Sequence, residues 1–530
     1  MKRYFFIIIM VSVNINLRAQ DSANSNAVDN YFYADLLKGI RTNPNNYLYA
    51  PIADYTASSL FYNYASGELK QGAEPEGIHE FGLSSTGIYH NKKGITFFGN
   101  LSIQKSYYDN LKWNLSYQLP DEGVMPDPHY FGVSKGAKWS NQEYNLQGGL
   151  FIPILTDRLH FLLNIEYGLA NKYRTDLDPR PEITYNDLGV TGGANYKISE
   201  QHSLKIAGEY GFTHVQNDIK FSNNDQNIPV NYDIYVKWIA GYGSLSNTFQ
   251  NSTLRRYKRK GLNLGYTYTS TKNLILADLS FLKKEQITYR SKEVEDEDDH
   301  SNYFATFKPS SIEFKLTAVH KITPLKSLKV EVLAKNTTGN NFWFSKGGKS
   351  YALNKNSALF NLGYIRQNNT QTLFDVGTKI SYSNVSQKDA LAATQSNLHN
   401  VNLAFYGLKS FQLNEHIALA PFAEIGLKYN LSSEFINGNQ IYLQNIAEND
   451  YAGLALKDYY NDVIYPDVEM LSSDLLDLTV GVNLKLASTN KFNTLLHIKA
   501  GNLWALNDLK YFSNTAPNRF QTSMGLTVYY

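Results

Sequence analysis

Long segments of this chain alternate between apolar and polar side chains, residue by residue. In one segment the apolar parity is Leu159, Phe161, Leu163, Ile165, Tyr167 and Leu169, and the other parity carries His160, Asn164 and Glu166. The same period recurs at 206–213, 262–268, 312–318 and 480–486. A period of two belongs to a β-strand with one apolar face. The alternation therefore predicts an all-β fold along the whole chain.

Strand length separates a membrane barrel from a soluble sandwich, whose strands also alternate. The alternating segments run to roughly 12–15 residues, longer than the five or six that are usual in globular sheets. Tilted membrane-spanning strands have this length when they project beyond the bilayer. The segment lengths therefore favour a transmembrane β-barrel.

The connections between these segments alternate between short and long, as in outer-membrane barrels. Short polar turns are predicted at 90–93, 156–158, 199–203, 271–273, 323–327, 414–416 and 488–491, and long connections at 108–140, 216–256, 291–303, 336–354 and 434–473. The weakest parts of the pattern are 232–245, which also fits loop structure, and the pair 358–366 and 372–383. We predict an antiparallel barrel over residues 51–530 of about 18 strands, between 16 and 20, with short periplasmic turns, long extracellular loops and both termini in the periplasm.

The N-terminus has the pattern of a secretory signal peptide over residues 1–20. Lys2 and Arg3 precede an apolar stretch that ends near Val13, and Arg18-Ala19-Gln20 provides a small-residue cleavage site. Residues 21–50 then form either a periplasmic lead or a segment inserted into the lumen. The chain has no Cys, and its 50 Lys+Arg balance 48 Asp+Glu. Thiolate metal sites and disulfides are excluded, and nucleic-acid binding has no support.

Charged side chains lie on the parity opposite the apolar one, which we expect to face the lumen. They are Lys205, Glu209, Glu313, Lys315, Lys329, Glu331, Glu424 and Lys428. A polar lumen is general in such barrels. The same charges suit either a selectivity ring or a salt-bridge network that closes the lumen, and their balanced signs argue against a strongly ion-selective pore.

Two further groups fall on the predicted extracellular loops. A basic run at 255–260 and an acidic run at 293–299 lie near the same rim, where they either neutralise one another or bind lipopolysaccharide phosphates and divalent cations. Aromatic residues provide candidate docking positions, namely Trp113, Trp343, Tyr459 and Tyr460. The alternative is that these rings pack the loops against each other.

No enzyme motif is present: there is no Gly-x-Ser-x-Gly elbow, no His-Glu-x-x-His helix and no phosphate-binding glycine loop. We expect no catalytic residues, no metal and no cofactor. The spacing of dispersed strand residues does not exclude a barrel hydrolase, which stays an alternative.

Short motifs carry a family resemblance. The Arg-Ala-Gln signal end, Asn43-Pro44, Asp178-Pro179-Arg180-Pro181 and the C-terminal aromatic Tyr530 are the motifs concerned. With them the chain resembles an uncharacterised family of large plugless Bacteroidota outer-membrane barrels, and Tyr530 resembles the terminal signal for barrel assembly. The resemblance implies association with TonB-dependent uptake systems. Asn43-Pro44 is also similar to an element of long-chain fatty-acid transporters of the FadL type.

The expected function is a non-enzymatic barrel in the outer membrane of a Gram-negative bacterium. It is either a passive solute channel or an accessory subunit of a TonB-dependent uptake complex, and a hydrophobic-substrate transporter is the alternative. Expected partners are outer-membrane lipid and lipopolysaccharide, with a TonB-dependent transporter or a surface lipoprotein in the accessory case. If the assignment of faces is correct, Leu264→Arg is costly on the lipid face and Thr267→Arg is tolerated on the lumen face.

Overall fold

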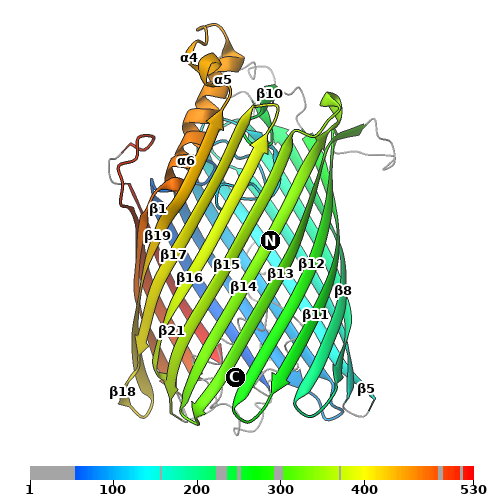
Figure 1. The fold of residues 1–530 in the computed structure, drawn as a ribbon, viewed down its shortest axis with the longest axis vertical. Helices are drawn as coiled ribbons and strands as arrows, with labels where there is room; N and C mark the ends of the chain where they lie inside the picture. The colour runs from blue at the N-terminus through cyan, green and yellow to red at the C-terminus, as the bar shows by residue number, and fades with distance from the viewer. Residues whose placement is uncertain are drawn as a thin grey trace, which may run out of the picture.

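The computed structural model describes residues 54–155, 158–221, 236–247, 252–291, 302–368, 372–487, 493–513 and 517–529. They form a closed antiparallel barrel of 18 strands, as the alternation predicts (Figure 1). The predicted signal peptide at 1–20, the segment 21–50 and Tyr530 lie outside the described residues.

The barrel strands are β1 (Tyr55–Gly67), β2 (Gly77–His90), β3 (Thr96–Leu111), β5 (Ala137–Leu155), β6 (Leu159–Arg174), β7 (Arg180–Lys197), β8 (His202–Lys220), β11 (Ser252–Thr269), β12 (Asn273–Tyr289), β13 (Tyr303–Thr323), β14 (Lys326–Trp343), β15 (Tyr351–Gln367), β16 (Thr372–Asp389), β17 (Thr394–Lys409), β19 (Ile417–Asn437), β20 (Leu475–Ala487), β21 (Asn493–Ala505) and β22 (Asn518–Tyr529). A short strand, β18 (Phe411–Asn414), continues β17 along β19.

The wall closes where the first strand meets the last. β1 pairs with β22 from Ala57 opposite Tyr529 to Gly67 opposite Arg519, and on its other side β1 pairs with β2. Because every barrel strand has a partner on both sides, the backbone groups of the wall are satisfied within the sheet. The sheet therefore has no open edge.

The two ends of the barrel differ in their connections. We call the end with the short turns the turn rim and the other end the loop rim. The first and last described strands, β1 and β22, begin and end at the turn rim. The two weakly patterned segments, 358–366 and 372–383, are strands and belong to β15 and β16. The predicted long connection 336–354 is shorter and spans only 344–350, because β14 and β15 extend further than the alternation indicated.

Side chains sort by parity, as the sequence predicts. Apolar residues such as Leu60, Leu146, Ile206 and Phe405 are exposed on the outer wall, and polar residues face inward. No helix in the described ranges is both long and apolar enough to serve as a membrane span. The apolar exterior around a polar lumen is that of an outer-membrane barrel.

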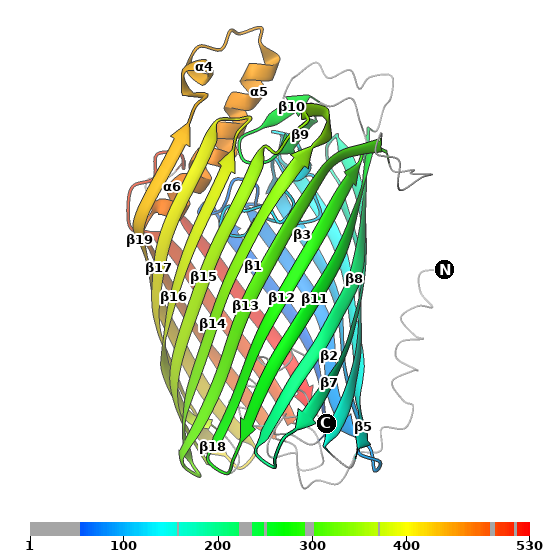
Figure 2. The same cartoon turned by 45° about the vertical axis from the view of Figure 1, so that its right-hand side comes forward.

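Three long connections pack together at the mouth of the barrel on the loop rim, and we call their described residues 112–136, 236–247 and 440–472 the loop plug; the third segment also projects beyond the rim (Figure 2). The first two contribute a small sheet of β4 (His129–Gly132), β9 (Lys237–Ala240) and β10 (Leu245–Asn247). The stretch 232–245 is therefore loop structure where it is described. The third contributes α4 (Gln440–Gln444), α5 (Tyr451–Tyr459), a π-helical turn η5 (Tyr460–Ile464) and α6 (Tyr465–Ser472), none of which the alternation indicated.

Candidate functional site

All eight charged residues predicted for the lumen lie on the inner face of the wall. On β8 the outward positions are Leu204, Ile206 and Tyr210, so Lys205 and Glu209 point inward. The same parity turns Glu313 and Lys315 of β13, Lys329 and Glu331 of β14, and Glu424 and Lys428 of β19 toward the lumen.

Lys205 forms a buried ion pair that spans a whole strand. Its Nζ lies 3.2 Å from Oδ1 of Asp278, and both side chains are almost inaccessible to solvent. Gly265 of the intervening strand β11 pairs with both residues, and a Cβ there would lie 2.6 Å from Cε of Lys205. The glycine therefore provides the space in which the ammonium crosses the strand.

Arg259 forms a second cross-strand ion network in the same way. Its Nη1 lies 2.5 Å from Oδ1 of Asp187 and its Nε 2.8 Å from Oε1 of Glu209. The guanidinium lies over Gly211 and Gly189, where an added Cβ would come within 2.6 Å and 2.3 Å of it. Two carboxylates in fixed positions hold the cation flat against the wall.

Glu313, Lys329, Glu331, Glu424 and Lys428 also find partners inside the barrel. Glu313 pairs with Lys335 at 3.2 Å, Lys329 with Glu331 at 3.3 Å and Glu424 with Lys379 at 2.7 Å. Lys428 donates instead to the carbonyl oxygens of Met470 and Leu471, at the C-terminal end of α6. A cation is favoured at that end of a helix. Ion pairs therefore line the inner face of the wall.

Below the loop plug the lumen contains a cavity of about 660 Å³, lined by charged and aromatic side chains that include Arg259, Glu209 and Lys335. It shares Glu209 and Lys335 with a second cavity of about 320 Å³ deeper in the lumen. Two rings that line the larger cavity, Tyr117 of the loop plug and Tyr185 of β7, stack with centroids 4.0 Å apart. Nζ of Lys172 lies 4.6 Å from the Tyr117 centroid. Aromatic faces and mixed charges suit a small polar solute.

The four aromatic residues proposed for docking are buried instead. Trp113, Trp343, Tyr459 and Tyr460 each expose 4% or less of their surface. Trp113 contacts Tyr459 edge-on at 5.2 Å, and its Nε1 donates to Asp462 at 2.9 Å. This corrects the expectation of an exposed docking surface: the rings pack the loops together, because a bundle of loops needs an apolar core of its own.

A buried ion pair fixes the first plug segment to the wall. Asp127 accepts hydrogen bonds from Nη1 of Arg255 and from the backbone N–H of His129. His129 in turn meets the amide of Asn341 at 3.1 Å. Burial lowers the pKa of His129 to about 4, so this imidazole is neutral at physiological pH.

The third plug segment is docked through a buried carboxyl. Oδ1 of Asp467 on α6 accepts a hydrogen bond from the backbone N–H of Gly72, in the connection between β1 and β2, at 2.7 Å. Burial raises the pKa of Asp467 to about 7, with the nearby Glu74 adding to the shift. Protonation of this group therefore falls in the physiological range.

No metal centre emerges from these residues. Within the described part of the chain, no group of three His, Asp or Glu side chains is placed to hold a metal ion.

Comparison with protein families decides where the chain belongs. The model of one family matches residues 44–530, which is most of the sequence and all of the described barrel. The chain belongs to DUF6850, a family of unknown function.

The DUF6850 barrel is similar in fold to solved outer-membrane structures. The siderophore receptor PiuA from Acinetobacter baumannii shares 8% identity, with 90% of this chain and 82% of that chain covered and a TM-score of 0.37. The outer membrane transporter YddB from Escherichia coli shares 7% identity, with 90% and 81% covered and a TM-score of 0.38. These likenesses assign no function. No curated protein matches the sequence.

Sequence reasoning on this DUF6850 member missed the acidic partners Asp127, Asp187, Asp278 and Asp467. Each meets its partner through the fold: Asp187 and Asp278 across one intervening strand, Asp127 between a connection and the wall, and Asp467 between two connections. One signal was available in the sequence: Gly189, Gly211 and Gly265 occupy inward positions, where a missing side chain leaves room for a neighbour's long cation.

Proposed function

We propose that this DUF6850 barrel is a non-enzymatic outer-membrane protein, closed at rest, that serves as an accessory subunit of a TonB-dependent uptake complex and not as a permanently open channel. The loop plug carries this proposal. Its core joins Trp113, Tyr242 and Tyr459 from three separate connections to wall residues Phe307 and Tyr351. A mouth filled by a packed core does not pass solutes at rest.

The cost of opening supports a closed resting state. Burial of one large apolar side chain contributes roughly 1.5–3 kcal/mol, and the plug core contains several such side chains. Polar side chains of the plug also form hydrogen bonds to the wall. One of them joins the hydroxyl oxygens of Tyr460 and Thr394, which lie 2.5 Å apart. Separation of these groups needs a partner or a ligand that favours the open form.

The helices of the plug support a protein partner. Figure 1 shows α4 and α5 standing beyond the loop rim, which the proposal places outside the cell. Three of their side chains are largely exposed to solvent: the exposed fraction is 77% for Ile441, 59% for Tyr451 and 47% for Tyr442. Exposed aromatic and aliphatic side chains on a projecting element are suited to docking.

The structure gives less support to lateral release of a hydrophobic substrate. Along the described wall each pair of neighbouring strands is hydrogen bonded, including the closing pair β1 and β22. A lateral exit would require some of these ladders to separate.

The test is purification of the protein from native outer membranes in mild detergent, with identification of co-purifying proteins and single-channel recording of the same sample. We expect a stable partner and no steady conductance. In the recordings, Trp113→Ala combined with Tyr459→Ala loosens the plug and should raise the frequency of open events. Phe411→Ala, which removes an exposed ring at the turn rim, is the matched control.

Other outcomes discriminate between the alternatives. Steady conductance from the lone wild-type protein would make it a porin. A lone and silent protein that depletes lipid or peptide substrates would instead favour a hydrolase.

A further inference from the structure

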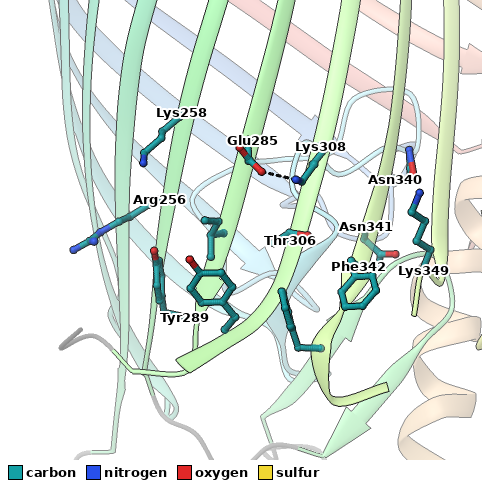
Figure 3. Close-up of a pocket in the computed structure, with 13 residues that line it drawn as sticks. Arg256, Lys258, Glu285, Tyr289, Thr306, Lys308, Asn340, Asn341, Phe342 and Lys349 are labelled. Atoms are coloured by element: carbon teal, nitrogen blue, oxygen red, sulfur yellow. Dashed lines mark ion pairs between the residues drawn. The ribbon is translucent and has the colours of Figure 1, made fainter. Parts of the chain in front are cut away.

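We propose that the outer wall carries a binding site for the phosphorylated headgroup of an outer-leaflet glycolipid of the lipid A type. The site is a cationic patch on β11, β12 and β13 and the neighbouring connection 344–350, at the loop rim (Figure 3). Its residues are Arg256, Lys258, Lys260, Lys283, Lys308, Lys349 and Glu285. The inference is independent of what the lumen holds and rests on the orientation that places the loop rim outside the cell.

The period of the strand divides the basic run at 255–260 between two faces. Arg255 and Arg259 point inward, where each pairs with lumen or plug carboxylates. Arg256, Lys258 and Lys260 continue the outward parity of Leu262 and Leu264. Two of the five cations are therefore structural, and the other three face the membrane surface.

The register places the patch directly beyond the apolar band. Leu262, Phe281 and Ile312 lie side by side on the three strands and are 42%, 38% and 48% exposed. The next outward row begins with Lys260 and Lys283, and Lys258 and Lys308 follow. Cations one row above lipid-facing side chains lie at the depth of the headgroups.

Among its described residues, the patch contains more cations than carboxylates. Lys260 lies directly opposite Lys283, a like-charge pair that costs stability unless an anion screens it. Glu285 is the patch carboxylate, and it is paired with Lys308. On β14 and β15 the outward positions in the same two rows are uncharged, with Thr338 opposite Asn354 and Asn340 opposite Ala352. The cations thus form a local patch and not a continuous belt.

The size of the patch favours a headgroup with more than one phosphate. Strands lie about 4.8 Å apart and alternate residues on one face about 6.7 Å apart, so three strands and three rows span roughly 10 by 13 Å. One phosphate contacts only part of that area. A cavity of about 570 Å³ adjoins the patch, and its lining includes Tyr289, Tyr303 and Phe342, rings of the kind found at membrane interfaces.

The test measures lipid affinity of the detergent-purified full chain by native mass spectrometry. The probes are diphosphoryl lipid A, monophosphoryl lipid A, phosphatidylglycerol and inorganic phosphate. We expect diphosphoryl lipid A to bind most tightly, and Lys258→Gln combined with Lys260→Gln and Lys283→Gln to weaken it at least about tenfold. Lys272→Gln with Lys321→Gln and Lys326→Gln removes the same charge at the turn rim and should change nothing.

A single variant separates lipid binding from a structural role. Lys260→Gln relieves the repulsion with Lys283, so the lipid-free protein should keep or raise its melting temperature while its affinity for diphosphoryl lipid A falls. A lower melting temperature with unchanged lipid affinity would show that the cations serve to neutralise the acidic run at 293–299, and would overturn the site. Equal binding of phosphatidylglycerol and diphosphoryl lipid A, or full competition by inorganic phosphate, would overturn it too.

Discussion

At the scale of the residue, small side chains decide where the large charged ones lie. Gly211 sits under the guanidinium of Arg259, with Cζ 2.6 Å from where a Cβ would be and the carbonyl oxygen of Leu188 at 2.8 Å. Gly208 on the same strand faces outward, and an added Cβ would meet nothing within 4 Å. Both glycines lie on β8, but only Gly211 lies against a charged side chain.

Gly211→Ala should therefore lower the free energy of unfolding by roughly 1–3 kcal/mol, because Arg259 must leave Asp187 or Glu209. Gly208→Ala should be neutral or slightly stabilising, since alanine restricts the unfolded chain. Denaturant unfolding in detergent micelles measures both. Equal effects at the two glycines would contradict the network.

The two faces of β11 provide a second test at this scale. Leu264→Arg places a charge on the lipid face and should cost about 2–4 kcal/mol. The prediction that Thr267→Arg is tolerated on the lumen face is wrong. Thr267 faces inward but is buried, so arginine does not fit there. Asn263 lies on the inward face and lines the deeper cavity, so Asn263→Arg should cost much less. Equal losses of unfolding free energy would show that the faces are misassigned.

At the scale of the element, strands were predictable and the plug was not. A strand repeats its pattern every second residue, so Lys205 and Glu313 could be assigned to the lumen without knowledge of any partner. The helices between 440 and 472 are short, and their apolar residues follow no long amphipathic period, because they pack on other loops and not on one flat sheet. Burial of Trp113 and Tyr460 depends on three connections that meet only in the fold.

Docking of α6 should depend on pH through Asp467. Its pKa is raised from 3.8 to about 7, so the folded state favours the protonated carboxyl. The resulting stabilisation is complete below the unfolded pKa and is lost as pH rises through about 7. The protection of the amides over 465–472, taken as the intrinsic exchange rate divided by the observed rate at the same pH, should therefore be greater at pH 5.5 than at pH 8.5.

Two variants check the source of this pH dependence. Asp467→Asn should remove it and keep protection high at both pH values. Glu448→Gln, at an exposed position of the same connection, should leave it unchanged. If Asp467→Asn retained the full pH dependence, another group would have to be responsible.

At the scale of the whole molecule, the orientation in the membrane is open to direct measurement. The native chain has no Cys, so a single introduced thiol reports one position. Ser345→Cys lies at the loop rim and Lys272→Cys at the turn rim, and both positions are exposed. We expect a membrane-impermeant maleimide to label Ser345→Cys on intact cells and Lys272→Cys only after lysis. The reverse result would invert the barrel and remove the basis of the glycolipid site.

The seam between β1 and β22 bears on how the molecule is made. Residues 57 and 529 are neighbours across this seam. The barrel can therefore close only after the last strand has been made and has paired with the first described strand. Contacts so distant along the chain form slowly, since a long loop must be ordered first. Until then both strands present unpaired edges that invite aggregation. Biogenesis should therefore be most vulnerable just before completion, and a chaperone that guards those two edges would protect it most.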